Sequence, residues 1–443
     1  MIWWLYNLLF PICYLLLMPR FLLRMWKRGG YAKGFTQRFA RYEASVAERI
    51  RELPRIWIHA VSVGEVHVAL RFVEELRKND PGLGFVVTTT TSTGHRIAEQ
   101  RMDPRDVLLY FPADFPPVVS RALNTIKPRA LVLTECELWP NLIREARSQG
   151  IPVVMINGRI SSSSYRGYRL LRPFFRRTVD AMDLLLVQSP VDRQRLVDLG
   201  ADQSRVRVVG TAKYDIAQRD NEGEEGIREL LDGLDMGSGS NLIVGGSTWP
   251  GEEEALLDIH ARLKPAVDNL KLVLVPRHAE RGREVEGQIA GRGIPYAKRS
   301  ELDVQSKTGA RPDVLLVDTT GELKHFYACA DVIFVGKSLT NHGGQNIIEP
   351  ALFAKAIIVG PNMENFPDVI DDFLAADGIV QVPDANALER ELKRLLSDPG
   401  ERAAYGARAA RVIEERRGSV ATSVRLITKC LQGTRNGAEP TEA

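Results

Sequence analysis

A glycine turn follows an apolar run in the second half of this chain. The run Asp331 to Val335 is largely apolar and β-branched, which favours a central parallel strand, and Gly343 and Gly344 come after it. Glycine lets the backbone approach an anion closely, and unpaired N–H groups at a following helix start would face a phosphate. Asn346 and Glu349 would share one helix face, where a carboxylate can accept hydrogen bonds from both hydroxyls of a ribose. The segment predicts a nucleotide-binding turn, with a helix start that binds no ligand as the alternative.

Acidic residues follow two apolar runs in the first half. Glu65 comes directly after Gly64 and would open a helix, a position that suits a general base. The helix start would lower the pKa of this carboxyl, and a Glu that only complements the helix dipole is the alternative. Glu135 and Glu137 lie two apart, so their side chains can face the same way in extended chain. A divalent metal would explain the pair, but no histidine cluster lies at ligand spacing, and Glu137 could instead cap the next helix.

Polar groups also follow the apolar runs of the second half. Arg277 carries N–H donors in a fixed fork and is the natural clamp for a phosphate, with a surface ion pair as the alternative. Ser247 and Thr248 could add hydroxyl donors at a helix start. Gly321 and Glu322 place backbone groups where a base could be recognised.

Several protein classes are disfavoured by motifs and composition. Gly336-Lys337-Ser338 resembles the end of a P-loop, but Asp331 stands where that motif requires its first glycine. No G-x-G-x-x-G opens the first strand–helix unit, which argues against a dinucleotide-dependent dehydrogenase. A net charge of +3 over 443 residues argues against a nucleic-acid binder that relies on bulk basicity. The four cysteines are far apart, which predicts free thiols in a reducing compartment.

Short apolar runs alternate with amphipathic helical patterns, which is typical of parallel sheets covered on both faces. In such sheets ligands bind beyond the carboxyl ends of the strands, where the residues above lie. The pattern predicts two doubly wound α/β domains that face each other across a cleft. The expected strands are 56–61, 85–89, 107–110, 130–134, 152–156, 184–187 and 206–209 in the first half, and 241–244, 271–275, 314–317, 331–335, 357–359 and 378–380 in the second.

Composition suggests the domain boundaries. We expect a membrane anchor at 1–28, a first Rossmann-like domain at 29–214, a polar, glycine-rich linker with room for one helix at 215–240, a second Rossmann-like domain at 241–432 and a disordered tail at 433–443.

The N-terminus is apolar from Met1 to Met18, apart from Asn7 and the helix-disturbing Pro11. A positive start and a small-residue cleavage site are both lacking, so the segment should be retained. Eighteen residues at about 1.5 Å each reach roughly 27 Å, which leaves a single span and an in-plane anchor open. An apolar helix docked on the body of the protein is the third alternative. The basic residues that follow predict that the rest of the chain lies on the cytoplasmic side.

Several strings, in this order, resemble the Kdo transferases of lipopolysaccharide synthesis, glycosyltransferase family 30. They are H-A-V-S-V-G-E (59–65), T-E-C-E-L-W-P-N (134–141), V-P-R-H (275–278), D-T-T-G-E-L (318–323) and G-G-Q-N-I-I-E-P-A (343–351). The resemblance covers nearly the whole chain. It implies a GT-B fold and an inverting transfer of 3-deoxy-D-manno-octulosonic acid (Kdo) from CMP-Kdo to the lipid A precursor lipid IVA, with no metal or other cofactor.

The resemblance also implies roles for individual residues. Glu65 matches the catalytic base, and Glu135 and Lys213 match residues that stabilise the transition state. The expected donor-binding residues, from the matched motifs and the strand ends, are Ser247, Thr248, Pro276, Arg277, Thr320, Gly321, Glu322, Ser338, Gly343, Gly344, Asn346 and Glu349. This chain departs from the usual family pattern at four positions on the donor side, which are Trp249, Thr320, Lys337 and Gln345.

The implied partners are CMP-Kdo, the lipid A precursor and membrane lipids, without nucleic acid, and the implied location is the cytoplasmic side of the inner membrane. The basic residues between anchor and first domain are placed for the phosphates of the acceptor or for anionic headgroups, with solvated surface charge as the alternative. They are Lys27, Arg28, Lys33, Arg38 and Arg41. Three rival functions stay open: a transferase for another nucleotide sugar, a nucleotide-sugar epimerase, and a membrane-tethered nucleotide sensor without activity.

Overall fold

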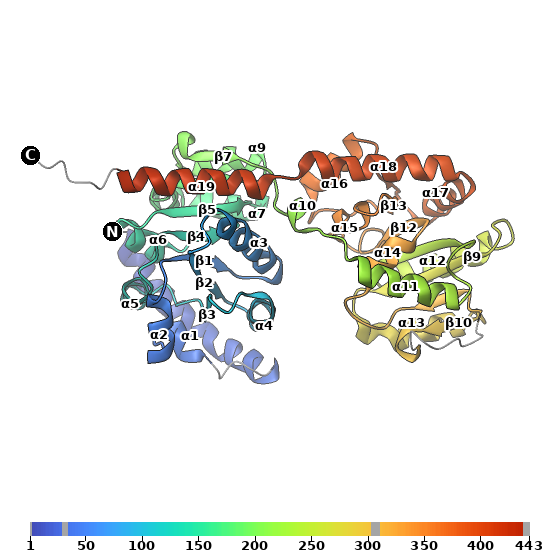
Figure 1. The fold of residues 1–443 in the computed structure, drawn as a ribbon, viewed down its shortest axis with the longest axis horizontal. Helices are drawn as coiled ribbons and strands as arrows, with labels where there is room; N and C mark the ends of the chain where they lie inside the picture. The colour runs from blue at the N-terminus through green and yellow to red at the C-terminus, as the bar shows by residue number, and fades with distance from the viewer. Residues whose placement is uncertain (1, 29–33, 303–310, 437–443) are drawn as a thin grey trace, which may run out of the picture. The chain divides into compact units, whose positions relative to one another are not determined.

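The computed structural model describes residues 2–28, 34–302 and 311–436. It divides into two compact units (Figure 1). Unit 1 comprises the described residues of Met1–Ile216 and Arg417–Ala443, and unit 2 comprises those of Ala217–Arg416. Within this described part each unit contains one seven-stranded parallel sheet with helices packed on it. The expectation of two doubly wound α/β domains is therefore confirmed.

Unit 1 has the strand order β3-β2-β1-β4-β5-β6-β7. Its strands are β1 (Arg55–Ala60), β2 (Gly84–Thr89), β3 (Val107–Tyr110), β4 (Leu131–Thr134), β5 (Val153–Gly158), β6 (Leu184–Val187) and β7 (Val206–Val208). Its helices are α1 (Ile2–Arg28), α2 (Ala44–Arg51), α3 (Val63–Asn79), α4 (Ser92–Arg101), α5 (Pro116–Ile126), α6 (Pro140–Ser148), α7 (Ser162–Leu170), α8 (Arg172–Asp180), α9 (Pro190–Leu199), α10 (Lys213–Ile216) and α19 (Ser419–Asn436). The central strands are buried on both faces, which explains their continuous apolar runs.

Unit 2 has the strand order β10-β11-β9-β8-β12-β13-β14. Its strands are β8 (Asn241–Thr248), β9 (Leu270–Pro276), β10 (Tyr296–Lys298), β11 (Val314–Leu316), β12 (Val332–Val335), β13 (Ala356–Val359) and β14 (Val380–Gln381). Its helices are α11 (Asn221–Gly233), α12 (Glu252–Leu263), α13 (Gly282–Ala290), α14 (Leu323–Cys329), α15 (Ile348–Ala351), α16 (Pro367–Ala375), α17 (Ala385–Ser397) and α18 (Pro399–Arg416).

The last helix, α19, returns to unit 1 and runs across it in red in Figure 1. Its buried side chains Val420, Val424 and Ile427 join the core that α3 forms with the sheet. Asp215 fixes the start of α19, because its carboxylate accepts the Gly418 N–H at 2.8 Å and the Ser419 hydroxyl at 2.8 Å. The expected boundaries differ here, since 241–432 was assigned entirely to the second domain.

The segment 215–240, expected as a linker, contains the helix α11 of unit 2, in which Ile227, Leu230 and Leu231 are buried. The expected tail also differs in part. Helix α19 extends to Asn436, and the remaining tail residues lie outside the described ones.

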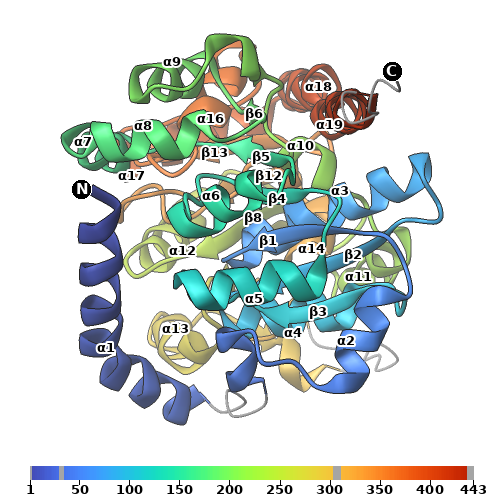
Figure 2. The same ribbon diagram turned by 90° about the vertical axis from the view of Figure 1, so that its left-hand side faces the viewer.

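Helix α1 lies along the side of unit 1 as one long helix that continues through Pro11 (Figure 2). Tyr6 donates a hydrogen bond to Asp114 Oδ2 at 2.8 Å, and Phe10 packs edge-on against Phe115 with ring centroids 5.3 Å apart. Among the described residues no helix is both long and apolar enough to cross a membrane. The structure thus gives no support to the membrane-spanning form of the expected anchor.

Candidate functional site

The strand order of unit 1 changes direction between β1 and β4. These strands pair in parallel, with Trp57 opposite Leu131 and His59 opposite Leu133. The carboxyl ends of two such strands form the crevice in which doubly wound sheets bind ligands. Glu65 follows β1 and Glu135 follows β4, so the structure brings the two predicted residues to this one point.

The carboxylate of Glu65 is held by the start of its own helix. Its two oxygens accept the backbone N–H groups of Val61 at 2.9 Å and Ser62 at 3.2 Å, while the Ser62 hydroxyl accepts the Glu65 N–H at 3.3 Å. This is a capping box, and Glu65 is 7% exposed. A carboxylate offers about four lone-pair sites, so both oxygens can still accept a hydrogen bond from a substrate hydroxyl. The capping role and a base role are therefore compatible.

Glu135 stands at the end of β4 in a left-handed backbone conformation, with φ of 59°. Such a conformation is uncommon for a residue other than glycine, and strained residues cluster at functional sites. Burial raises the pKa of the Glu135 carboxyl, and the charge of Glu65 raises it further. The nearby cation of Lys213 lowers it. The three residues predicted to be catalytic thus share one electrostatic neighbourhood in unit 1.

Glu137 belongs to the same cluster, although it was not among the predicted catalytic residues. Burial raises the pKa of its carboxyl to about 7, helped by the charges of Glu65 and Glu135. A carboxyl with this pKa exchanges a proton near neutral pH. The signal that could have identified it is the spacing of Glu135 and Glu137 directly after a buried strand.

The loop that carries Lys213 is fastened by Asn157, at the end of β5. Asn157 Oδ1 accepts the Ala212 N–H at 3.0 Å and lies 3.5 Å from the Thr211 hydroxyl. Asn157 is buried and has a positive φ of 52°, a conformation that asparagine tolerates better than most residues. Asn157 therefore positions Lys213, and sequence reasoning missed this role.

The strand order of unit 2 changes direction between β8 and β12. Val335 at the end of β12 lies opposite Gly246 of β8. Ser247 and Thr248 end β8 and are buried, and Pro276 ends the adjacent strand β9. Arg277 follows β9 with an exposed side chain, and its backbone N–H donates to Thr248 O at 3.0 Å. The predicted phosphate clamp therefore lies at the ligand-binding edge of its sheet.

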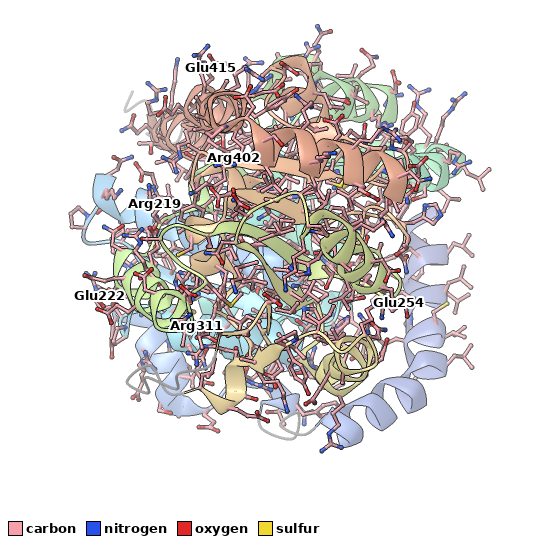
Figure 3. All side chains as sticks on the ribbon, turned by 90° about the vertical axis from the view of Figure 1, so that its right-hand side faces the viewer. Arg219, Glu222, Glu254, Arg311, Arg402 and Glu415 are labelled. Atoms are coloured by element: carbon pink, nitrogen blue, oxygen red, sulfur yellow. The ribbon has the colours of Figure 1, made fainter. Side chains whose placement is uncertain are left out.

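The loop after β12 is organised by Glu252, the first residue of α12. This fully buried carboxylate accepts four backbone N–H groups at 2.8 to 3.0 Å, those of Trp249, Lys337, Ser338 and Leu339. Glu254, two residues further on, is exposed on the outer side of the same helix (Figure 3). Ser338 is buried, and its hydroxyl donates to Val335 O and accepts the Gly360 N–H. Its predicted contact with the donor nucleotide stays a prediction.

The glycine turn is held by hydrogen bonds within its own unit. Gly343 and Gly344 have positive φ values of 110° and 67°, as their glycine identity suggests. Their N–H groups, however, already donate to Glu364 Oε2 at 2.6 Å and to Lys337 O at 2.9 Å. These two N–H groups are therefore engaged within the loop, and the expectation that N–H groups of the following helix start face a phosphate stays a prediction.

Asn346 and Glu349 meet as predicted, although the helix α15 begins only at Ile348. Asn346 Nδ2 donates to Glu349 Oε1 at 3.3 Å, and Asn346 Oδ1 accepts the Ile348 N–H at 3.1 Å. Burial raises the pKa of the Glu349 carboxyl, while the charges of Lys324 and Arg277 lower it. The proposed ribose acceptor and the proposed phosphate clamp thus lie close enough to interact.

The segment Thr320-Gly321-Glu322 precedes α14. Gly321 has a positive φ of 94°. The Glu322 carboxylate forms an ion pair with Arg299 at 2.7 Å and accepts the Thr319 hydroxyl. This leaves the backbone of the segment, rather than the Glu322 charge, as the candidate contact for a base. The described residues hold no group of three or more His, Cys, Asp or Glu that could bind a metal ion, and the metal-free reaction stays a prediction.

Comparison with known proteins identifies the family to which a chain with these site residues belongs. Residues 33–216 match the family described as 3-deoxy-D-manno-octulosonic-acid transferase (kdotransferase). A 3-deoxy-D-manno-octulosonic acid transferase from Bordetella pertussis is 34% identical over 399 residues, which cover 88% of this chain and 91% of that protein. The chain belongs to the Kdo transferase family. Membership in this family makes it a glycosyltransferase.

Two further proteins that are similar to this chain are informative. A bifunctional glycosyltransferase/methyltransferase from Fusobacterium nucleatum is 35% identical over 325 residues, which cover 72% of this chain but only 49% of that protein. The solved structure of UDP-GlcNAc 2-epimerase from Neisseria meningitidis has a TM-score of 0.58 at 12% identity, covering 86% of this chain and 100% of that one. At this identity the second likeness concerns the fold alone, and it supports the expected GT-B fold.

Proposed function

We propose that this chain is an inverting glycosyltransferase that moves Kdo from CMP-Kdo to the lipid A precursor lipid IVA. The observation that carries the proposal is the meeting of Glu65, Glu135 and Lys213 at the point where the strand order of unit 1 changes direction. A buried base, a second carboxyl and a cation are what the activation of a sugar hydroxyl requires. Family membership supports Kdo as the transferred sugar.

In the proposed reaction the Glu65 carboxylate takes the proton of an acceptor hydroxyl. The hydroxyl oxygen forms a bond to the anomeric carbon of Kdo, while the bond from that carbon to the phosphate oxygen breaks on the opposite face. The electron pair of the broken bond leaves with CMP. Because the hydroxyl attacks on the face opposite the departing phosphate, the configuration at the anomeric carbon inverts. The backbone N–H groups of Val61 and Ser62 hold the Glu65 carboxylate in one orientation, which keeps it directed at the acceptor hydroxyl during the transfer.

Glu135 and Lys213 adjust the charge around this base. The Lys213 cation lowers the pKa of Glu135 and so favours its ionised form. Asn157 serves this step indirectly, because it fixes the loop before Lys213.

The donor nucleotide is proposed to bind to unit 2. Arg277 would oppose the charge that grows on the departing phosphate, an effect that commonly lowers a barrier by about 3 kcal/mol per donor. Glu349, oriented by Asn346, would accept hydrogen bonds from the ribose hydroxyls. The exposed side chain of Arg277 and its charge interaction with Glu349 support this assignment.

We also propose that α1 lies in the surface of the inner membrane, with both units on the cytoplasmic side. One face of α1 contacts unit 1 through Tyr6 and Phe10. The other face exposes Trp4, 82% accessible, together with a row of leucine and isoleucine side chains. They are Leu5, Leu8, Leu9, Ile12, Leu15 and Leu16. Such a two-faced helix favours in-plane binding to a bilayer surface, where a lipid acceptor is found.

The test is incubation of the detergent-purified chain with CMP-Kdo, generated in situ, and lipid IVA, followed by the mass of the product. The proposal predicts a gain of one or more Kdo units and competition by CMP but not by UDP. A transferase for another nucleotide sugar would leave lipid IVA unchanged and respond to a different nucleotide. An epimerase would convert a nucleotide sugar without any acceptor.

A further inference from the structure

We propose that Lys337, held over the ring of Trp249, binds a second anionic group of the donor, the carboxylate of the transferred sugar acid. Arg277 would bind the phosphate, so each of the two cations would bind one of the two anionic groups of the donor. The inference rests on the proposed function, because a CMP-linked sugar acid carries both a phosphate and a carboxylate.

The position of the pair supports a ligand-binding role. Trp249 directly follows β8, and Lys337 comes two residues after the end of β12. These are the two strands between which the order of unit 2 changes direction, where doubly wound sheets bind their ligands. The ammonium of Lys337 lies 4.8 Å from the centroid of the Trp249 ring. A cation at this distance over an indole face is attracted by it, which orients the lysine side chain.

One buried carboxylate fixes the backbones of both residues. Glu252 Oε2 accepts the Trp249 N–H at 2.9 Å and the Lys337 N–H at 2.8 Å. The Lys337 carbonyl in turn accepts the Gly344 N–H at 2.9 Å. The backbone of Lys337 is therefore held through both its N–H and its carbonyl group, which fixes the point from which its side chain extends.

The backbone conformation of Lys337 also points to a role for its side chain. Its φ is 57°, in the left-handed region where glycine is accommodated at lower cost. The preceding residue Gly336 is confined by its neighbours, since an added Cβ would lie 2.6 Å from Ser247 O. Lys337 therefore occupies a strained backbone position, and strained residues cluster at functional sites.

Among the described residues Lys337 and Arg277 form no ion pair, although the charge of Arg277 acts on Glu349. Within the described ranges neither side chain has a carboxylate at ion-pair distance, whereas Lys324 pairs with Asp220 at 3.0 Å and Arg281 pairs with Glu253 at 2.7 Å. Trp249 lies between them in the strand order, because it follows β8, which lies between β9 and β12. Its ring also contacts His278, the neighbour of Arg277, with centroids 5.7 Å apart. Two cations without an ion-pair partner, which flank Trp249 in the strand order, fit a ligand with two adjacent negative charges.

The experiment compares the donor with CMP, which keeps the phosphate but lacks the sugar carboxylate. For Lys337→Met we expect the KM for CMP-Kdo to rise about tenfold, because a charge-assisted contact is lost. The inhibition constant of CMP should stay within about twofold of the wild-type value. Lys337→Arg should recover most of the affinity for CMP-Kdo, and Lys393→Met, an exposed lysine of α17, should change neither constant.

Three outcomes decide the matter. A selective rise in the KM for CMP-Kdo supports the proposal. A parallel loss of affinity for CMP-Kdo and CMP, or no change in either, would overturn it and leave Lys337 with a packing role on Trp249. Failure of the wild-type chain to transfer Kdo from CMP-Kdo would overturn the proposed function and this inference together. A thermal unfolding curve of each variant shows that any loss does not come from misfolding.

Discussion

Burial raises the pKa of Glu135 at the end of β4, and the carboxylate of Glu65 raises it further. The two residues are 70 positions apart in the chain, but β1 and β4 pair in parallel and end at the same edge of the sheet. Two acidic groups this close favour one proton between them, and the Lys213 cation limits that effect on Glu135. Burial and the Glu65 charge outweigh the Lys213 cation, so the pKa of Glu135 stays above its ordinary value.

Glu137 should make the stability of the protein fall as the pH rises. Burial and neighbouring charges raise its pKa to about 7 from an ordinary value of 4.5, so the folded state retains a proton that the unfolded state has lost between these values. Its contribution to stability is complete below about pH 4.5 and is lost as the pH rises through 7. Glu137→Gln mimics the protonated form. We expect urea denaturation to show the variant more stable than wild type at pH 8 and similar at pH 5. A variant less stable than wild type at pH 8 would refute the assignment.

Asn157 should affect turnover without touching the substrate. Asn157→Ala removes the acceptor of the Ala212 N–H and disfavours the positive φ, so the loop before Lys213 should shift. A displacement of this kind can lower kcat by roughly ten- to a hundredfold. Asn157→Asp keeps an acceptor oxygen and should retain more activity than the alanine variant. Steady-state kinetics check this order, and equal losses in both variants would argue against a positioning role.

Glu252 should be essential for the stability of unit 2. Glu252→Ala leaves four backbone N–H groups without their acceptor, which should lower the free energy of unfolding by at least about 3 kcal/mol. Glu254→Ala is the matched control on the exposed side of the same helix (Figure 3), and it should change stability by less than about 0.5 kcal/mol. Chemical denaturation measures both. Similar losses in the two variants would mean that Glu252 does not organise the loop after β12.

Much of the fold could be predicted because both sheets are parallel and buried. The sequences of their strands are therefore continuous apolar runs, and ligand-binding residues follow the strand ends. The strand β10, Tyr296–Lys298, was missed because it has three residues that are only partly buried. The return of α19 to unit 1 could not be predicted, since an amphipathic pattern shows that one face is buried but not which sheet covers it.

In the candidate site, too, local features could be predicted from the sequence and tertiary contacts could not. The spacing of Ser62 and Glu65 is that of a capping box and could have predicted how Glu65 is held. The hydrogen bonds of Gly343 and Gly344 could not be predicted, because their acceptors belong to Glu364 and Lys337 and depend on tertiary packing. Contacts between distant residues decide which polar groups remain available to a ligand.

The most direct test of the central claim is the rate of Kdo transfer to lipid IVA by Glu65→Gln. Glutamine keeps an oxygen that can accept a backbone N–H of the capping box but is a far weaker base, so we expect a folded protein whose kcat falls about 100- to 10,000-fold. Glu74→Gln, an exposed residue of the same helix α3, should keep the wild-type rate. A Glu65→Gln variant with wild-type turnover would contradict the proposed role of Glu65 as the base.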